Sequence, residues 1–147
     1  MFKVSTKGDY GLLLMTALAE HFIQNGVAIV SLKMIAEEKN LSLSYISQLI
    51  LPLKNAGLVL SKEGLGGGYR LAKHPSQISL LEILEALEGP IAPVRCCNEK
   101  ADKCQCESSC NAKSAWHDAI SLLQHHLESR KLFDLIRKKP DESIIFS

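Results

Sequence analysis

The chain has 147 residues, of which 46% are apolar and 22% are charged, and its formal net charge is +1. This length fits one ordinary domain, or a small domain with an accessory element, and the apolar content is too high for a disordered chain. The near-neutral total excludes a strongly basic protein, but the charge is uneven. Residues 1–75 hold eight Lys and Arg against five Asp and Glu, whereas residues 76–147 hold nine against eleven. The N-terminal half is therefore the better candidate for binding an anion.

No segment of the sequence suggests a membrane or an export signal. The most apolar stretch, residues 11–19, has about half the length that a transmembrane helix needs, and the N-terminus lacks the residue order of a secretory signal. We therefore expect a cytoplasmic protein without membrane attachment. The five cysteines would stay reduced there and serve as metal ligands or redox groups rather than structural disulfides.

Three helices are expected in the first third of the chain. Apolar residues at helical spacing predict a helix over residues 9–24. Ser31 can cap a second helix over about residues 32–39, and Ser42 can cap a third over residues 43–56. Two helices joined by a turn of three or four residues are typical of a helix-turn-helix motif.

A β-hairpin is expected directly after the third helix. Residues 58–62 and 69–72 read as two short strands around the glycine-rich turn 63–68. A hairpin in this position is the wing of a winged helix-turn-helix.

The second half of the chain is predicted to hold two more helices. Ser79 and Glu82 form a capping-box pattern that opens a helix ending at Glu88. The cysteines follow, and helical periodicity returns over residues 112–137 with Trp116 on its apolar face. One helix of that length would reach roughly 35–40 Å, more than a small domain covers, so we expect a partner helix and a dimer core there.

The expected fold is therefore mainly α with a small β-hairpin wing: a winged helix-turn-helix plus a long dimerisation helix. Its predicted parts are a winged helix-turn-helix domain in residues 1–75, a dimerisation region in residues 76–137 with a Cys-rich loop at 91–111, and a C-terminal tail in residues 138–147.

Polar side chains at the start of the third helix would point into a DNA major groove. Gln can pair with adenine, Ser with base edges or phosphate, and Tyr with phosphate or a thymine methyl. Nearby cations would meet the phosphates, and the wing glycines would let the backbone approach the DNA. Alternatively, these side chains are merely solvated and the glycines merely turn the hairpin, but their ordered combination favours DNA binding. The expected DNA-binding residues are Ser42, Ser44, Tyr45, Gln48, Lys33, Lys54, Lys62, Arg70, Gly66 and Gly67.

Five cysteines lie within fifteen residues, at Cys96, Cys97, Cys104, Cys106 and Cys110. Several thiolates on one loop select iron–sulfur clusters or zinc. The Cys-x2-Cys pairs usual in zinc sites are absent, so the spacing favours a cluster and leaves zinc as the alternative.

Four stretches of the sequence resemble a known family. They are residues 4–10, 43–49, 55–59 and 66–69. With them, over about residues 1–135, the sequence resembles the winged-helix transcriptional regulators that include the iron–sulfur regulator IscR and the nitric-oxide sensor NsrR. The resemblance implies a homodimer that binds a partly palindromic double-stranded DNA operator through the third helix and the wing. It also implies a repressor, the commoner mode in that family.

The resemblance also implies three cysteine ligands for a 2Fe-2S or 4Fe-4S cluster. Cys104 and Cys110 match the last two family cysteines. The first is Cys97 or Cys96, with Cys97 preferred, and Cys106 is then an extra thiol.

The fourth ligand departs from the IscR pattern. IscR-like members have a histidine three residues after the last cysteine, where this sequence has Lys113, which is protonated and a poor ligand. NsrR-like members use an acidic residue in the first helix, and Asp9 stands at the matching place, where it would reach the loop of the opposite subunit. His117 is a second candidate. Alternatively, Asp9 is a first-turn acid favoured by the helix dipole and His117 a surface residue.

Gain, loss, oxidation or nitrosylation of the cluster would switch operator affinity. The alternative is a thiol- or zinc-based regulator without a cluster. No phosphate loop, Cys-x-x-Cys redox pair or paired carboxylate site is present in the sequence, so we expect neither an enzyme nor a small-molecule substrate.

Overall fold

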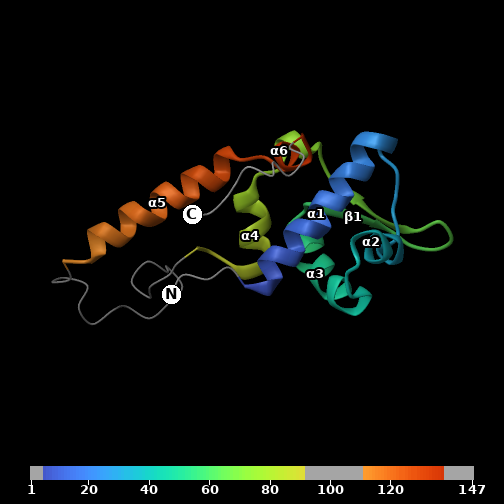
Figure 1. The fold of residues 1–147 in the computed structure, drawn as a ribbon, viewed down its shortest axis with the longest axis horizontal. Coiled ribbons are helices and arrows are strands. Elements are labelled where there is room, and N and C mark those ends of the chain that lie inside the picture. The colour runs from blue at the N-terminus through green and yellow to red at the C-terminus, as the bar shows by residue number, and fades with distance from the viewer. Residues whose placement is uncertain (1–4, 92–110, 138–147) are drawn as a thin grey trace, which may run out of the picture.

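The computed structural model describes residues 5–91 and 111–137. These residues form a mainly α fold with one antiparallel two-stranded sheet (Figure 1), which confirms the predicted fold class. In chain order the elements are α1 (Thr6–Asn25), α2 (Leu32–Lys39), α3 (Leu43–Asn55), β1 (Val59–Lys62), β2 (Gly68–Leu71), the 3-10 helix η1 (Pro75–Gln77), α4 (Leu80–Glu88), α5 (Lys113–Ser129) and α6 (Leu132–Arg137).

Helix α1 is the centre of the core. It packs against α2, α3, α4, α6 and β2, and Figure 1 shows it crossing the body diagonally. At Gly11, a Cβ atom would overlap the side chain of Leu87 in α4. A larger residue there would require the Leu87 side chain to move, so glycine suits this contact between the two helices.

The two predicted serine caps are confirmed, and they set the helix-turn-helix. The Ser31 hydroxyl accepts a hydrogen bond from the backbone N–H of Met34 (3.2 Å), and the Ser42 hydroxyl accepts one from that of Tyr45 (3.3 Å). Between the helices, Asn40 takes a left-handed conformation with φ 52°, which Asn tolerates better than most residues. The turn therefore ends α2 and starts α3 within three residues.

The wing is hydrogen-bonded to the helix-turn-helix. Strands β1 and β2 pair from Val59 opposite Leu71 to Lys62 opposite Gly68. Val30 and Tyr69 exchange two backbone hydrogen bonds of 2.9 and 2.8 Å. Since Val30 directly precedes the cap of α2, the wing is fixed to the start of the motif.

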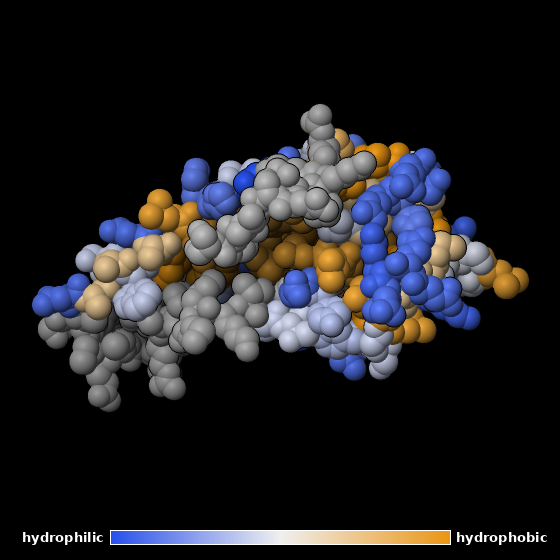
Figure 2. All heavy atoms as spheres, viewed as in Figure 1, coloured by the Kyte–Doolittle hydropathy of each residue, from blue (hydrophilic) through white to orange (hydrophobic). Residues whose placement is uncertain are grey.

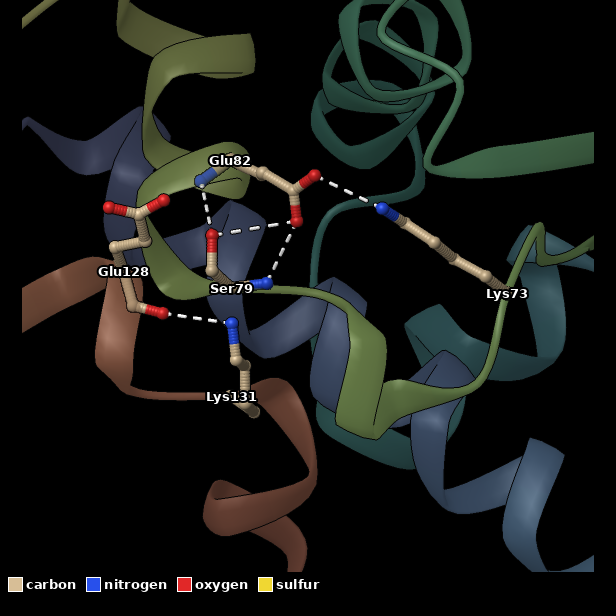
Figure 3. Close-up of polar contacts among 5 residues, drawn as sticks. All are labelled: Lys73, Ser79, Glu82, Glu128 and Lys131. Carbon is tan, nitrogen blue, oxygen red and sulfur yellow. Dashed lines mark hydrogen bonds and ion pairs between the residues drawn. The ribbon is translucent and has the colours of Figure 1, made fainter.

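The capping box at α4 is also confirmed (Figure 3). The Ser79 hydroxyl accepts from the Glu82 N–H (3.1 Å), and the Glu82 carboxylate accepts from the Ser79 N–H (2.9 Å). Lys73 lies 3.0 Å from the other Glu82 oxygen. This ion pair ties the segment after the wing to the start of α4.

The prediction of one long helix over residues 112–137 is wrong. The helix breaks at Arg130, which is extended (φ −88°, ψ 126°), and the chain pairs instead with the segment before α4. The Arg130 carbonyl accepts from the Leu80 N–H and the Ile78 carbonyl from the Leu132 N–H, both at 2.9 Å. Asp134 then caps the new helix by accepting from the Lys131 N–H (2.9 Å). Helix α5 alone has 17 residues, about 25 Å.

Helix α5 extends away from the body (Figure 1). Ile120 is its one buried residue, and Trp116 and Leu122 are 43% and 73% exposed. Figure 2 shows apolar side chains along α5 and on the body beside it. Within the residues described, no helix is both long and apolar enough to cross a membrane.

Candidate nucleic-acid interface

The N-terminal half of α3 presents two polar side chains to solvent. Ser44 and Gln48 are both exposed, and they are four residues apart, so they lie on the same face of the helix. Within residues 5–91 and 111–137 neither side chain has a hydrogen-bonding partner. Ser47, which is also exposed, donates its hydroxyl to the Leu43 carbonyl (2.6 Å) instead. Ser44 and Gln48 are therefore the side chains of this turn that remain available for an external partner.

Ser42 and Tyr45 are held by the fold itself. The Ser42 hydroxyl is exposed but caps α3. The Tyr45 ring is half-buried and lies edge-on against the Tyr10 ring of α1, with centroids 5.4 Å apart and planes at 89°. This geometry is a favourable aromatic contact. Tyr45 thus connects α3, the predicted recognition helix of the motif, to α1, a structural role that the sequence did not reveal.

The cations expected to meet phosphates form no ion pair with the other described residues. Lys33, Lys54 and Lys62 are exposed and Arg70 is half-buried. In the described part of the chain, none of the four lies within ion-pair distance of a carboxylate.

Two other lysines of the same half are neutralised. Lys39 lies 2.6 Å from Glu20, and Lys73 lies 3.0 Å from Glu82. Among the described residues of this half, the unpaired cations are those on and beside α2, α3 and the wing, where the DNA is predicted to lie, together with the exposed Lys7 at the start of α1.

The wing glycines are explained by the steric and conformational needs of the hairpin itself. A Cβ atom at Gly67 would overlap the Lys62 carbonyl, and one at Gly68 would overlap the Val30 carbonyl. Gly66 has φ 71° with open space around it. The alternative reading, that the glycines close the hairpin, thus has structural support, and their contact with DNA stays a prediction.

The expected cluster ligands Cys97, Cys104 and Cys110, with the alternatives Cys96 and Cys106, all lie outside the described residues. Asp9 and His117 are described, and both are exposed. Within the described ranges, no three His, Cys, Asp or Glu side chains come together as a metal site.

Glu88 is a residue that sequence reasoning missed. One of its carboxylate oxygens accepts hydrogen bonds from the backbone N–H groups of Ser5 (3.2 Å) and Gly8 (3.1 Å), and also from the Ser5 hydroxyl. It therefore caps the N-terminus of α1, where Ser5 makes no cap with its own side chain. A carboxylate is favoured there by the free N–H groups and the helix dipole.

This cap joins two parts of the chain that lie eighty residues apart in sequence and that each adjoin predicted functional residues. Glu88 is the last residue of α4, four positions before the undescribed segment 92–110 that holds all five cysteines. Asp9, the predicted fourth ligand, directly follows the capped Gly8 and precedes Tyr10, which contacts the recognition helix. A capping acid contributed by a distant helix leaves no local sequence pattern, so no signal could have identified it.

Comparison with known proteins gives one family. The model of the Rrf2 family, described as an iron-dependent transcriptional regulator, matches residues 4–138. The transcriptional regulator CymR of Bacillus subtilis (strain 168) is 50% identical over 92 residues, 63% of this chain and 64% of CymR, which is less than two thirds of that relative's length. The transcriptional regulator IscR of Vibrio cholerae is 34% identical over 134 residues, 91% of this chain and 75% of IscR.

Solved structures agree with the sequence comparisons. CymR, described as the global cysteine regulator of B. subtilis, superposes with a TM-score of 0.74 at 40% identity, covering 92% of this chain and 97% of that one. IscR of T. potens superposes with a TM-score of 0.70 at 38% identity, covering 92% and 86%.

Proposed function

The chain belongs to the Rrf2 family of transcriptional regulators, and from this premise we propose that it is a cytoplasmic, homodimeric DNA-binding repressor whose operator affinity is switched by an iron–sulfur cluster on the Cys-rich segment. Its relatives are regulators rather than enzymes. The observation that carries DNA binding is the start of α3, where Ser44 and Gln48 are exposed without internal partners beside unpaired cations.

The geometry of the motif supports major-groove reading by α3. A helix whose first turn is exposed can bring Ser and Gln side chains to base edges. Lys33 and Lys54 then lie on the two helices of the motif, and Lys62 lies on the wing. This distribution suits phosphates on both sides of a groove, because each cation is carried by a different element.

A homodimer is supported by helix α5. Trp116 is 43% exposed in a single chain and lies one turn from the buried Ile120 on the apolar face of the helix, and an amphipathic helix of this length is stable in water chiefly when that face is covered. A second α5 offers the same apolar face, as an isologous interface requires. The dimer would also set the spacing of two recognition helices on a palindromic operator.

The proposed cluster switch is supported by the cysteine thiols and by two further exposed donor side chains. Five cysteine thiols in residues 96–110 are the soft ligands that iron–sulfur clusters take, and Asp9 and His117 are exposed oxygen and nitrogen donors. We assign Cys97, Cys104, Cys110 and Asp9 as the ligands. A bound cluster would supply a group that is gained, lost or oxidised as iron and oxidant levels change.

Contacts within the chain give such a change a route to α3. The segment with the cysteines follows Glu88, which holds the first turn of α1 through Ser5 and Gly8. The next turn residue, Tyr10, packs on Tyr45 of the recognition helix. A rearrangement of the segment would therefore act on α3 through packed and hydrogen-bonded groups.

Anaerobic purification tests the switch directly. We expect coloured protein with iron and acid-labile sulfide, and lower or higher affinity for a selected DNA site after the cluster is removed. Cys110→Ser should abolish the colour, whereas the matched variant Cys106→Ser should keep it because Cys106 is the extra thiol. Colourless, iron-free protein from oxygen-free cells would refute cluster switching and leave the DNA-binding function intact.

A second candidate is favoured by the similarity to a cysteine regulator. CymR shares 50% identity over 92 residues and is described as the global cysteine regulator of B. subtilis. A thiol- or zinc-based regulator without a cluster would be colourless, would bind zinc or respond to thiol oxidation, and would lose its response in Cys→Ser variants. Metal analysis of the same anaerobic protein separates the two candidates.

A further inference from the structure

The tip of the wing presents a leucine that nothing in the fold requires. The Gly67 N–H donates to the Gly64 carbonyl (3.0 Å), which closes a turn with Leu65 and Gly66 at its centre. Gly66 has φ 71°, as the third position of a type II turn demands. Leu65 has a relative exposure of 104%, and the next apolar side chain among the exposed ones in the described residues, Leu122, has 73%. The turn is thus made by glycines and a backbone hydrogen bond, without help from the leucine.

The surface at the end of the hairpin is apolar as a consequence. Figure 1 shows the turn between β1 and β2 projecting past the helical body, and Figure 2 shows hydrophobic colouring at that extremity of the molecule. Turn centres are usually glycine, proline or small polar residues. The fold does not bury Leu65, so removing this side chain from water would stabilise a complex with a partner rather than the fold itself.

The position of the tip selects DNA as that partner. Strand β2 is joined to Val30 by two backbone hydrogen bonds, and Val30 leads directly into α2 of the helix-turn-helix. The wing that carries the tip is therefore joined by backbone hydrogen bonds to the helix-turn-helix. Unpaired Lys62 lies in β1 at the base of the same turn. When α3 lies in a major groove, a wing attached in this way reaches the adjacent stretch of the duplex.

Resting on the DNA-binding function proposed above, we propose that Leu65 is an apolar wedge that enters the minor groove beside the site read by α3. The minor groove is about 6 Å wide, and proteins insert Leu, Ile, Met or Pro there against base steps and sugars. The tip residues 64–67 carry no charge and the residue before them, Glu63, is acidic, so the tip contributes apolar shape and no phosphate pairing. The base steps that deform most easily, TA and CA/TG, are the class that this wedge favours.

The test uses the protein of residues 1–147 and a DNA site that the wild type enriches from random duplexes. Affinity is measured by fluorescence anisotropy at several salt concentrations. For Leu65→Ser we expect affinity about five- to tenfold weaker with an unchanged salt slope, because no phosphate contact is lost. The matched control Lys62→Ala should reduce the salt slope by about one. A second selection with Leu65→Ser should lose the preference for pyrimidine–purine steps beside the α3 site.

Folding does not confound this test, because Leu65 is fully exposed and its replacement should leave the melting temperature and the dimer mass unchanged. Equal affinity and equal step preference in Leu65→Ser and wild type would overturn the wedge. So would a change in oligomeric mass, since the leucine would then contact protein. Failure of the wild type to enrich any duplex would refute the proposed function together with the wedge, whereas normal enrichment with an inert Leu65 would refute the wedge alone.

Discussion

Removing the Glu88 carboxylate should loosen the start of α1. In the structure this group accepts three hydrogen bonds from the first turn, two of them from the Ser5 and Gly8 N–H groups at 3.2 and 3.1 Å. Losing an N-terminal cap costs about 1 kcal/mol and up to about 2 kcal/mol, and losing the favourable charge at the helix dipole adds about 0.3–1 kcal/mol at a surface site. For Glu88→Ala we therefore expect about 1–3 kcal/mol less stability.

Thermal unfolding followed by circular dichroism measures this loss. Each kcal/mol lowers Tm by about 2–4 °C in a domain of this size, so Glu88→Ala should lower Tm by about 2–12 °C. Reduced, metal-free protein is used so that cluster binding does not contribute. Glu88→Gln keeps an oxygen acceptor without the charge, so its Tm should lie between those of the wild type and Glu88→Ala.

Glu85→Ala is the matched control for this prediction. Glu85 lies one turn earlier on α4, is exposed, and its side chain has no hydrogen bond within the residues described. Its loss should change stability by less than about 0.5 kcal/mol. Equal Tm values for Glu85→Ala and Glu88→Ala would refute the assignment of Glu88 as the cap of α1.

Two further predictions concern the recognition helix and the start of α4. Gln48→Ala should weaken operator binding by about 1–3 kcal/mol and relax the base preference at one position, as measured by competition with base-substituted duplexes, while the exposed Gln24→Ala on α1 should bind as wild type. Partial burial alone would raise the pKa of Glu82, but the hydrogen bond from the Ser79 N–H and the Lys73 ammonium outweigh it and lower that pKa below its ordinary value. A lowered pKa stabilises the fold above the unfolded-state pKa and loses this contribution as the pH falls through the folded-state value. In urea titrations the stability difference between wild type and Glu82→Gln should therefore be largest near neutral pH and shrink below about pH 4; a difference that grows in acid would contradict the sign.

The fold was predictable where its signals are local. Ser31, Ser42 and the Ser79–Glu82 pair cap their helices through groups three residues away, so the pattern in the sequence contains both partners of each bond. The break at Arg130 was not predictable in this way. The apolar periodicity continues through it without Gly or Pro, and the helix stops because Arg130 and Leu132 pair with Leu80 and Ile78, some fifty residues away.

In the candidate site too, residues that depend on local sequence patterns could be predicted and residues that depend on distant contacts could not. Ser44, Gln48 and the unpaired lysines could be chosen from the sequence because their position on capped helices follows from local pattern, and the structure leaves their side chains available. Glu88, Tyr10 and Leu65 could not. The first two act through contacts with residues far along the chain, and Leu65 is distinguished by a lack of contacts, which a sequence does not display. In the sequence, a leucine in a turn carries no evident meaning. The structure shows that the turn is closed by the Gly67–Gly64 hydrogen bond and the conformation of Gly66, without any contact from Leu65. The groups that recognise DNA are therefore best sought among exposed side chains whose removal leaves the fold unchanged, and the groups that could transmit a signal among buried or capping contacts whose removal does not.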